Sequence, residues 1–417
     1  MTISGSENIR LALSAVWVHR FRSLLTVLGI VIGITTVVTV ASLLSGVRRG
    51  VVTFFQELGP DNLFVYKTSG DPQSGGASEK EARRRPILPE YAGMLRDAAT
   101  TLDDVSLQLF IPGIVGGRPI SARVPGFESD AVTINGQAAN LIDLSPREFA
   151  EGRYFTPDEE ARRARVAAIG WDLAEALFPE GDRVGKTFLA DGAEYTVVGV
   201  FEKAKGGFLG QNGIDTQIAI PLATARLRYP QIDRFMIVCK AKPGMRDEAL
   251  EEVEGLLRKI RRTPPGEEND FALSTPDQII QQFDKITGLI GLVAIALSAL
   301  GLLVGGIGVM NVMLVSVTER TREIGTRMAI GARRRDIVGQ FLAEAMTLTG
   351  IGGVLGIFVA IAITFLISAL VPSLSSDVPP WAVAAAFLTS VSVGLFFGVW
   401  PAVKAARLDP VEALRYE

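Results

Sequence analysis

The sequence predicts an α-helical membrane protein with four transmembrane helices and a large extracytoplasmic α+β domain inserted between helices 1 and 2. Four apolar stretches are each long enough to cross a hydrocarbon core of about 30 Å, and they lie at 23–47, 286–316, 341–371 and 381–403. The long segment 61–274 mixes short β-branched runs, turn residues and amphipathic helical patterns. Basic residues gather at both ends of the chain and between the second and third stretches, which indicates that these parts are cytoplasmic.

The composition argues against several classes of protein. Of 417 residues, 48% are apolar and the mean hydropathy is +0.30, which is high for a soluble protein. The 42 basic residues nearly balance the 45 acidic ones, so nothing points to nucleic acid. With one cysteine and one histidine, we expect no metal site and no catalytic residues of the Cys/His type. Cys239, on the same strand face as Phe235 and Ile237, is expected to be a small buried core residue.

The first helix is expected to extend beyond the membrane. Residues 1–22 alternate apolar and basic side chains, a pattern typical of an amphipathic segment on the inner membrane surface. Residues 23–47 carry no charge and form the first span. An apolar stripe continues through 48–60 with charged residues beside it, and Gly59-Pro60 is a strong stop. We therefore predict a stalk over 48–60.

The segment 61–274 is predicted to be a mixed α+β domain without repeats. The expected strands are 62–67, 166–170, 187–189, 195–200, 217–221 and 234–240, and the expected helices are 171–178 and 246–261. Asp191-Gly192 is a hairpin signal between two of the strands. The Gly/Ser-rich and then charged segment 70–85 is expected to be a loop.

A second stalk is predicted at 275–285, leading into the second span at 286–316. Thr275 and Gln278 form a capping-box pattern with Pro276 at the first helical position. No helix breaker follows for about 40 residues, or about 60 Å, which is twice the membrane core. The excess must project outward, so two stalk helices are expected to stand together.

The last two spans complete the membrane part. Glu344, the one charge in 341–371, is placed in the first turn of that span, at the inner interface. The outer loop 372–380 has no Lys or Arg, and Trp381 and Trp400 suit the two interfaces of the fourth span, 381–403. The C-terminal segment 404–417 is again basic. We therefore expect both termini to be cytoplasmic.

The charged segment 317–337 is expected to be a helical cytoplasmic loop. Glu323 and Arg327 stand at i,i+4 spacing and Glu319 and Arg322 at i,i+3, which supports a helix. Gly325 and Gly331 are expected to break it into short pieces, and the apolar Ile324, Met328 and Ile330 to give it a docking face. The alternative is that its arginines are only a topological anchor.

Three segments carry a family resemblance. The words ERTREIGTRMAIGARRRDI and QFLAEA within Val317–Ala345 resemble the loop between the second and third membrane helices of MacB-type ABC permeases. RSLLTVLGIVIGI (Arg22–Ile34) is similar to the first membrane helix of that MacB/FtsX-like family, and PAVKAARLDPVEALRYE (Pro401–Glu417) to its C-terminus. The resemblance implies a permease subunit in a bacterial inner membrane that couples ATP hydrolysis to motion of the periplasmic domain. Its cargo would be a drug, a peptide or a lipoprotein.

The same resemblance implies partners and coupling residues. Many MacB proteins carry a fused N-terminal ATPase, whereas 22 residues precede the first span here, so the ABC ATPase is expected in trans. A second copy or a homologous permease, the lipid bilayer and a periplasmic adaptor are the other expected partners. No cofactor is expected in this chain, because ATP and magnesium would be bound by the ATPase. The implied coupling residues are Glu319, Arg320, Arg322, Glu323, Gly325, Arg327, Gly331 and Ala332.

Two other functions are alternatives for this chain. An FtsX-like signalling or scaffold protein would use the same motion to activate an extracytoplasmic partner, although the domain here is larger than such relatives would have. A receptor or enzyme would need reactive groups, yet the acidic pairs Asp103/Asp104 and Glu159/Glu160 resemble solvated surface. GDRVGKT at 181–187 has three residues between its glycines where a phosphate-binding loop needs four.

The spans hold little polarity and several small residues. Asn311 is the most polar group deep inside them, so they are expected to transmit motion, with a path between subunits as the alternative. Each span carries a Gly-x-x-x-Gly pair, namely Gly29/Gly33, Gly301/Gly305, Gly352/Gly356 and Gly394/Gly398. Small residues let membrane helices approach closely. Gly29/Gly33 is thus a candidate for packing within the chain or for a dimer seam.

Overall fold

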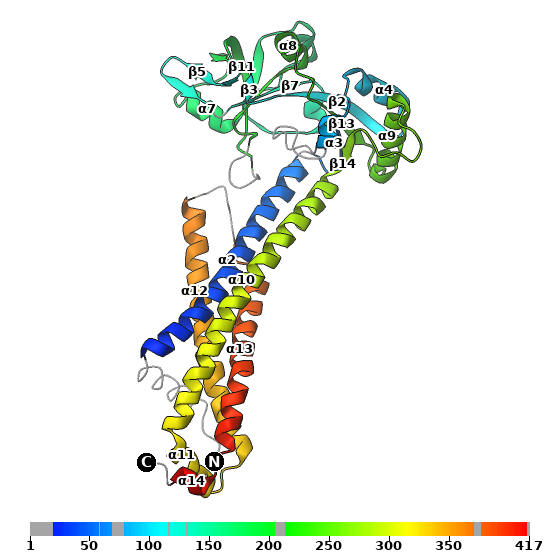
Figure 1. Ribbon diagram of the computed structural model, residues 1–417. Coiled ribbons are helices and arrows are strands. Elements are labelled where there is room, and N and C mark those ends of the chain that lie inside the picture. Colours follow the sequence, from blue (N-terminus) through cyan, green and yellow to red (C-terminus); the bar gives the residue numbers. More distant parts are fainter. Residues whose placement is uncertain are drawn as a thin grey trace. The chain divides into compact units, whose positions relative to one another are not determined.

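The computed structural model describes residues 20–57, 59–68, 79–115, 117–130, 132–204, 213–370 and 377–414 (Figure 1). The chain divides into two compact units. The helical unit comprises Met1–Val47 and Asp284–Glu417, and the α+β domain comprises Arg48–Phe283. The predicted amphipathic N-terminus lies, up to residue 19, outside the described residues.

The helical unit contains the predicted spans. Within the described residues, four helices are long and apolar enough to cross a membrane, and they contain Thr26–Gln56, Pro276–Glu319, Arg334–Leu370 and Pro380–Ala406. They belong to α2 (Arg20–Glu57), α10 (Pro276–Glu319), α12 (Arg334–Leu370) and α13 (Pro380–Ala406). The short helices α11 (Thr321–Ala329) and α14 (Pro410–Leu414) complete the unit. With the α+β domain between α2 and α10, the predicted fold class is confirmed.

Each of the helices α2 and α10 has residues in both units, because the boundaries between the units fall inside these helices. Gly59, with φ of 100°, stands just beyond the end of α2, in a backbone conformation that favours glycine. At the start of α10, the predicted capping box is present: Gln278 N–H donates to Thr275 Oγ1 (3.2 Å) and Thr275 N–H to Gln278 Oε1 (3.1 Å). The 44 residues of α10 make a helix of about 66 Å at 1.5 Å per residue.

Small residues bring the long helices of the helical unit together. A Cβ built on Gly29 would lie 3.0 Å from Gly305 Cα, and one on Gly33 would lie 2.9 Å from Leu302 Cγ. Gly352 and Gly356 pack on α2 in the same way, and Gly394 and Gly398 pack on α12. All four glycine pairs therefore serve close packing within one chain, including Gly29/Gly33. The dimer seam considered for Gly29/Gly33 has no support in this arrangement.

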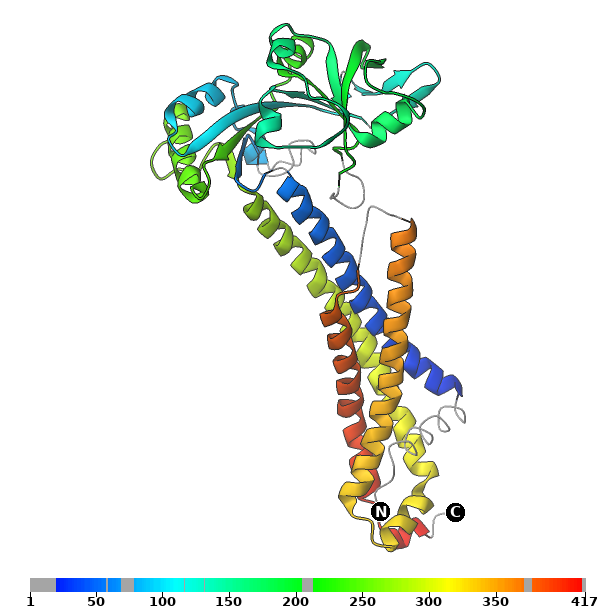
Figure 2. The ribbon, with the colours of Figure 1, turned by 180° about the vertical axis from the view of Figure 1, so that it is seen from behind.

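In the described residues, the α+β domain is built on one mixed sheet of twelve strands, with order β14-β1-β13-β2-β7-β12-β9-β11-β10-β5-β6 and β8 paired with β11. Figure 2 shows the ribbon of this domain from behind. Its strands are β1 (Asn62–Tyr66), β2 (Leu102–Ile111), β5 (Ala122–Val124), β6 (Phe127–Ser129), β7 (Thr133–Gln137), β8 (Phe149–Gly152), β9 (Val166–Ile169), β10 (Thr187–Ala190), β11 (Ala193–Phe201), β12 (Gln217–Pro221), β13 (Phe235–Ala241) and β14 (Ala272–Ser274). A separate hairpin pairs β3 (Ile114–Val115) with β4 (Arg118–Pro119). The pairs β7/β12 and β9/β11 are parallel, and the others are antiparallel.

Helices cover the sheet and enclose the core. They are α3 (Glu79–Ala82), α4 (Glu90–Ala98), α5 (Leu141–Leu144), α6 (Pro157–Ala161), α7 (Trp171–Leu177), α8 (Leu222–Arg228) and α9 (Arg246–Arg261). Alternate residues of the strands, such as Leu107 and Leu109 of β2, join Leu95 of α4 and Val253 of α9 in one buried apolar cluster. Through these alternate residues, the sheet packs against the helices α4 and α9.

Most predicted elements of this domain are present. The Asp191-Gly192 hairpin forms with φ of 44° and 73° at its two turn residues, and α9 has the predicted limits. The loop predicted at 70–85 contains the short helix α3, while residues 69–78 lie outside the described residues. No helix or strand was predicted between residues 90 and 165, the part of the chain that contains α4 and the central strand β2.

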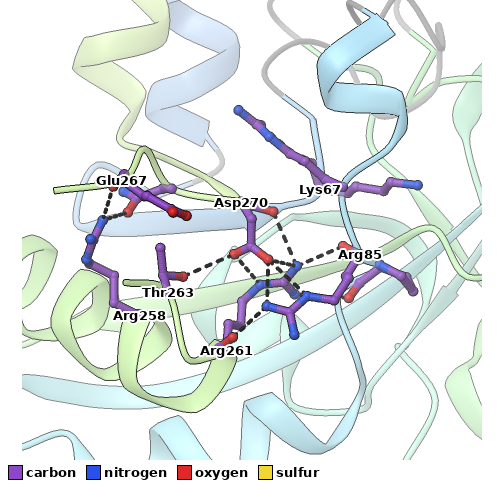
Figure 3. Close-up of polar contacts among 10 residues, drawn as sticks. Lys67, Arg85, Arg258, Arg261, Thr263, Glu267 and Asp270 are labelled. Carbon is purple, nitrogen blue, oxygen red and sulfur yellow. Dashed lines mark hydrogen bonds and ion pairs between the residues drawn. The ribbon is translucent and has the colours of Figure 1, made fainter. Parts of the chain in front are cut away.

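A buried ion pair fastens the last strand of the domain (Figure 3). The Arg261 side chain, at the end of α9, is 0% exposed and donates from Nε to Asp270 Oδ1 over 2.7 Å. Its other nitrogens donate to the carbonyl oxygens of Pro86, Arg85 and Asp270. Arg85 also pairs with Asp270 at 2.9 Å. The approach to β14, and hence the start of α10, is thereby tied to α9.

Candidate coupling site

The predicted loop 317–337 consists of two helix ends around α11. Arg320 separates α10 from α11, so the predicted Glu319–Arg322 pair spans a helix break. Helix α11 ends in a Schellman motif, in which Gly331 N–H donates to Met328 O (3.1 Å) and Ala332 N–H to Arg327 O (3.0 Å). Gly331 has φ of 105°, which favours glycine. The prediction that Gly331 breaks the helical pattern is correct.

Gly325 does not break the helix, contrary to the sequence-based prediction. It lies in the middle of α11 and is buried against α14, where a Cβ on it would approach Ala413 Cβ to 2.7 Å. Asp409 precedes the first residue of α14, and its side chain accepts a hydrogen bond from Val411 N–H (2.8 Å) as an N-cap. Gly325 is therefore needed for close contact between two short helices, and not for a turn.

The expected apolar docking face is also mostly wrong. Ile324 is 2% exposed and belongs to a core cluster with Val317 and Phe341, and Met328 packs on the same cluster. Only Ile330, at 82% exposed, faces outward. Helical spacing placed the three residues on one segment but gave no information on which side the rest of the chain covers.

One hydrogen bond and one ion pair join α11 and its N-cap residue Arg320 to α12. Arg327 pairs with Glu323 at the predicted i,i+4 spacing and also donates to Gln340 of α12. Arg320 pairs with the largely buried Glu344 at 3.4 Å. Because α12 begins at Arg334, Glu344 lies in the third turn of the helix and not in the first turn, as the sequence analysis expected. These contacts hold α11 against the start of α12.

The outward surface of this site is basic. The exposed arginines are Arg322, Arg333, Arg334 and Arg335, and Ile330 is exposed as well. The Asp336 carboxylate caps α12 by accepting a hydrogen bond from Arg333 N–H (3.0 Å). Glu319 and Glu323 are exposed too, whereas Ala332 is half-buried in the core cluster. Ala413, Gln340 and Glu344 were not assigned to the site from the sequence, because their roles depend on contacts between distant segments.

We call Thr321–Asp336 with α14 the coupling surface. It is basic, and its exposed large apolar side chains are Ile330, Val411 and Leu414.

The described residues show little chemistry elsewhere. They contain no group of three or more His, Cys, Asp or Glu arranged to hold a metal ion. Cys239 is buried in the core of the α+β domain as predicted, and burial raises the pKa of its thiol to about 12. The GDRVGKT segment connects helix α7 to strand β10, the reverse of the strand-to-helix order of a phosphate-binding loop.

The acidic pairs of the α+β domain have structural roles. Asp104 pairs with Arg96 at 3.1 Å, and Asp103 with Lys240 at 3.6 Å. Glu159 forms a capping box with Thr156. The expectation of a solvated surface is wrong for Glu160, which is half-buried and accepts from Ala139 N–H. Burial raises its pKa, and the hydrogen bond opposes this shift.

Comparisons with known proteins define the class of this chain. Residues 23–256 match the MacB-like periplasmic core domain, and residues 295–410 match the FtsX-like permease C-terminal domain. This chain is a multi-pass membrane permease. It belongs to the MacB/FtsX-like permease family, as the resemblance implied.

Similar proteins include exporters with ATP-binding parts. The chain is 33% identical over 417 residues to the pyoverdine export ATP-binding/permease protein PvdT of Pseudomonas putida, covering 99% of this chain and 60% of that protein. It is 32% identical over 410 residues to the macrolide export ATP-binding/permease protein MacB of Burkholderia thailandensis, covering 98% and 60%. The chain thus spans about 60% of the length of these curated relatives. The periplasmic region of MacB from Actinobacillus actinomycetemcomitans aligns with 55% of this chain and 95% of its own at a TM-score of 0.43 and 15% identity.

Proposed function

We propose that this chain is the permease subunit of an ABC-type, ATP-driven export or extraction machine in the bacterial inner membrane, with both termini cytoplasmic. An ABC ATPase docks on the coupling surface, and its closure moves α10 and α2, which lead to the α+β domain. The observation that carries the proposal is the continuity of α10, whose one end adjoins α11 and whose other end leaves the domain at Thr275.

The coupling surface suits this role because it is stiff where force would enter. Gly325 seats α11 on α14, and the Arg320–Glu344 and Arg327–Gln340 contacts seat it on α12. A displacement of α11 would therefore move α12 and α14 with it. The exposed arginines and Ile330 remain available to a partner. Arg and large apolar side chains are common anchors at the centres of protein interfaces.

The relatives support the energy source. Several are named as export ATP-binding/permease proteins. We propose that an ABC ATPase acts on this chain, that the ATPase binds the ATP and magnesium, and that the residues of this chain contribute no catalytic group. Two permease subunits would stand above two ATPase subunits. The cargo would be a drug, peptide or lipoprotein, and a periplasmic adaptor would complete an export path.

The proposal is tested by purifying the tagged chain from its native membranes in a gentle detergent and identifying bound proteins by mass spectrometry. A stoichiometric ABC ATPase is the expected result. The variant Glu323→Lys with Arg327→Glu keeps an opposite-charge pair on α11 but exchanges the two charges that face a partner. We expect it to reduce recovery of the ATPase at least about tenfold, as for loss of a central charged contact.

The matched control is Arg226→Glu, an exposed arginine near the end of α8, which should leave recovery unchanged. Full ATPase recovery and activity with the charge-exchanged variant would show that the coupling surface is misassigned. Purification of the chain without any ATPase would remove the energy source and favour the scaffold alternative. Labelled cargo in reconstituted vesicles then separates export from signalling.

A further inference from the structure

An apolar groove runs between α12 and α13. It has a volume of about 690 Å³ and extends over α12 from Gly339 to Leu355 and over α13 from Phe387 to Leu395. Among the lining residues that the structure describes, the one polar side chain is that of Thr347, whose hydroxyl donates to a carbonyl oxygen of α12 (2.7 Å). We call this the α12/α13 groove. It presents an apolar wall to a bound molecule.

The groove is long enough for a lipid chain. From Gly339 to Leu355 the helix rises about 24 Å at 1.5 Å per residue. One leaflet occupies half of a hydrocarbon core of about 30 Å. An acyl chain of one leaflet therefore fits within the groove along its whole length.

Two glycines of α12 keep the groove open. A Cβ built on Gly339 or on Gly350 would meet nothing within 4 Å, whereas one on Gly356 would lie 2.9 Å from Ile34 Cβ of α2. Glycine inside a helix is unfavourable relative to alanine, and packing within the chain offsets this at Gly356. At Gly339 and Gly350 no contact within the described chain does so. These two positions leave room for another molecule.

Positive charge gathers at the end of the groove where α12 begins. Arg335 lies four residues before Gly339, so the two are on the same side of the helix. The Arg335 side chain is 74% exposed, and its ion pair with Asp336 is loose at 3.8 Å. Arg333 and Arg334 are exposed as well. The stretch 333–336 thus has three guanidinium groups and one carboxylate, which leaves it positive.

An anionic phospholipid matches both parts of this site. Its acyl chains are apolar, and its phosphate oxygens accept paired hydrogen bonds from a guanidinium group. Basic residues beside a pocket between membrane helices are a known arrangement for binding anionic head groups. An apolar helix of a protein partner would fill the groove but leave the positive charge of 333–336 without a counter-charge. Charge complementarity therefore favours the lipid.

We infer that the α12/α13 groove binds an anionic phospholipid, with an acyl chain along Gly339–Leu355 and the phosphate on Arg335. This binding goes beyond the proposed function, because it requires no ATPase. Arg335 also belongs to the coupling surface, so the head group of the lipid adjoins the place where the ATPase docks. The lipid composition of the membrane then acts on the same end of α12 as the ATPase.

The test is photo-labelling of the full chain in phosphatidylcholine vesicles that contain a trace of phosphatidylglycerol with a photoreactive acyl chain. Labelled residues are identified by mass spectrometry of peptides. We expect the label mainly on the groove residues of α12 and α13, and less on the exposed apolar residues of α10. Unlabelled phosphatidylglycerol should compete at least about fivefold better than phosphatidylcholine, the effect of one basic residue near an anionic head group.

A first variant fills the groove. Gly350→Leu adds a side chain where a Cβ meets nothing within 4 Å, so the fold of the helical unit is not disturbed. It should reduce labelling of the groove at least about threefold, because the acyl chain loses its contacts with the groove floor. Gly288→Leu on α10 is the matched control, since a Cβ there also meets nothing within 4 Å, and it should leave labelling of the groove unchanged.

A second pair of variants tests the head group. Arg335→Gln should reduce the preference for phosphatidylglycerol about fivefold and leave labelling by a photoreactive phosphatidylcholine unchanged. Arg334→Gln removes the same charge but lies 100° further around the helix, away from Gly339, and should change the preference by less than about twofold.

Equal labelling of the groove by the neutral and the anionic lipid would overturn the inference. So would labelling spread evenly over α10 and the groove, or cross-linking of the groove to a second protein chain in place of lipid. The labelling is measured without ATPase, so it is separate from the proposed function. Recovery of the ATPase with no labelling of the groove would count against this site alone, and labelling without recovery of the ATPase would count against the proposed function alone.

Discussion

Buried charge in this protein is found where several hydrogen bonds meet it. Arg261 is enclosed at the end of α9 and reaches Asp270 and three carbonyl oxygens. For Asp270, burial alone would raise the pKa, but the hydrogen bonds from Arg261 and Arg85 outweigh it and lower the pKa below its ordinary value. Residues 85, 261 and 270 thereby act as one structural unit.

Replacing Asp270 should destabilise the α+β domain. Asp270→Asn leaves the fully buried Arg261 guanidinium without its counter-charge, which we expect to reduce the free energy of unfolding by about 2–3 kcal/mol, less than for a fully enclosed pair because Asp270 is partly exposed. For a domain of this size, the melting temperature should fall by about 5–10 °C. Intrinsic fluorescence during heating of the full chain in detergent measures it.

The control is Arg83→Met, which removes an i,i+4 pair whose side chains are 78% and 84% exposed and should change the melting temperature little. The pH dependence gives a further check. Because the folded pKa of Asp270 is lowered, its contribution is complete above the unfolded pKa of about 4 and is lost as the pH falls through the folded pKa. The gap between wild type and Asp270→Asn should therefore narrow as the pH falls below about 4, and a constant gap would contradict this account.

At the scale of elements, glycine decides how closely the helices of the helical unit approach. Gly29 and Gly305 put α2 and α10 in backbone contact, and Gly325 does the same for α11 and α14. These glycines lie inside helices, where glycine is unfavourable by about 1 kcal/mol relative to alanine. The close packing of the helices, which only glycine allows at these positions, offsets this unfavourable helix propensity.

Gly325→Ala should therefore be harmful despite its better helix propensity. The added methyl group would lie 2.7 Å from Ala413 Cβ, and such overpacking costs about 1–3 kcal/mol. We expect faster hydrogen exchange in α14, measured by mass spectrometry, and lower recovery of the ATPase. Ala413→Gly should rescue both properties in the double variant.

Gly339→Ala is the matched control, because a Cβ there meets nothing within 4 Å. It should leave hydrogen exchange in α14 and ATPase recovery unchanged. If Gly325→Ala behaved like this control, the seating of α11 on α14 would not matter for coupling.

At the scale of the whole molecule, both helices that enter the α+β domain meet one side chain. Arg246, at the start of α9, donates to Pro60 O (3.2 Å) just after α2 and pairs with Asp277 (2.6 Å) in the first turn of α10. Strand pairing reinforces the link, since β1 follows α2, β14 precedes α10, and the two strands are hydrogen-bonded. The domain thus holds both helices at neighbouring points.

Arg246→Ala should weaken the transmission of motion without disturbing ATPase binding. The ion pair is partly exposed, and such pairs contribute up to about 1 kcal/mol, so transport in vesicles should fall by no more than about fivefold. ATPase recovery should match wild type. Arg262→Ala, at the other end of α9 and with an exposed side chain, should leave both unchanged, and an equal transport loss there would contradict a specific role for Arg246.

Prediction from the sequence succeeded where a local rule operates. Uncharged length identified the four spans, Thr275 and Gln278 identified the start of α10, and Asp191-Gly192 identified the hairpin. It failed at Gly325, Ile324 and Glu344, where the outcome depends on a segment distant in sequence. The coupling residues remain a prediction from the family resemblance, and that resemblance did not indicate which of them are buried and which are exposed.

The sequence by itself determined that four helices can cross a membrane, where α10 begins, and to which family the chain belongs, because hydropathy, capping and motif words are local properties. Only the tertiary structure decided that Gly29 and Gly33 contact α10 of the same chain, that α14 supports α11, and that Asn311 faces outward. Those properties depend on which helix faces meet. The meeting of faces is fixed by packing between residues that are far apart in the chain, and no local pattern encodes it.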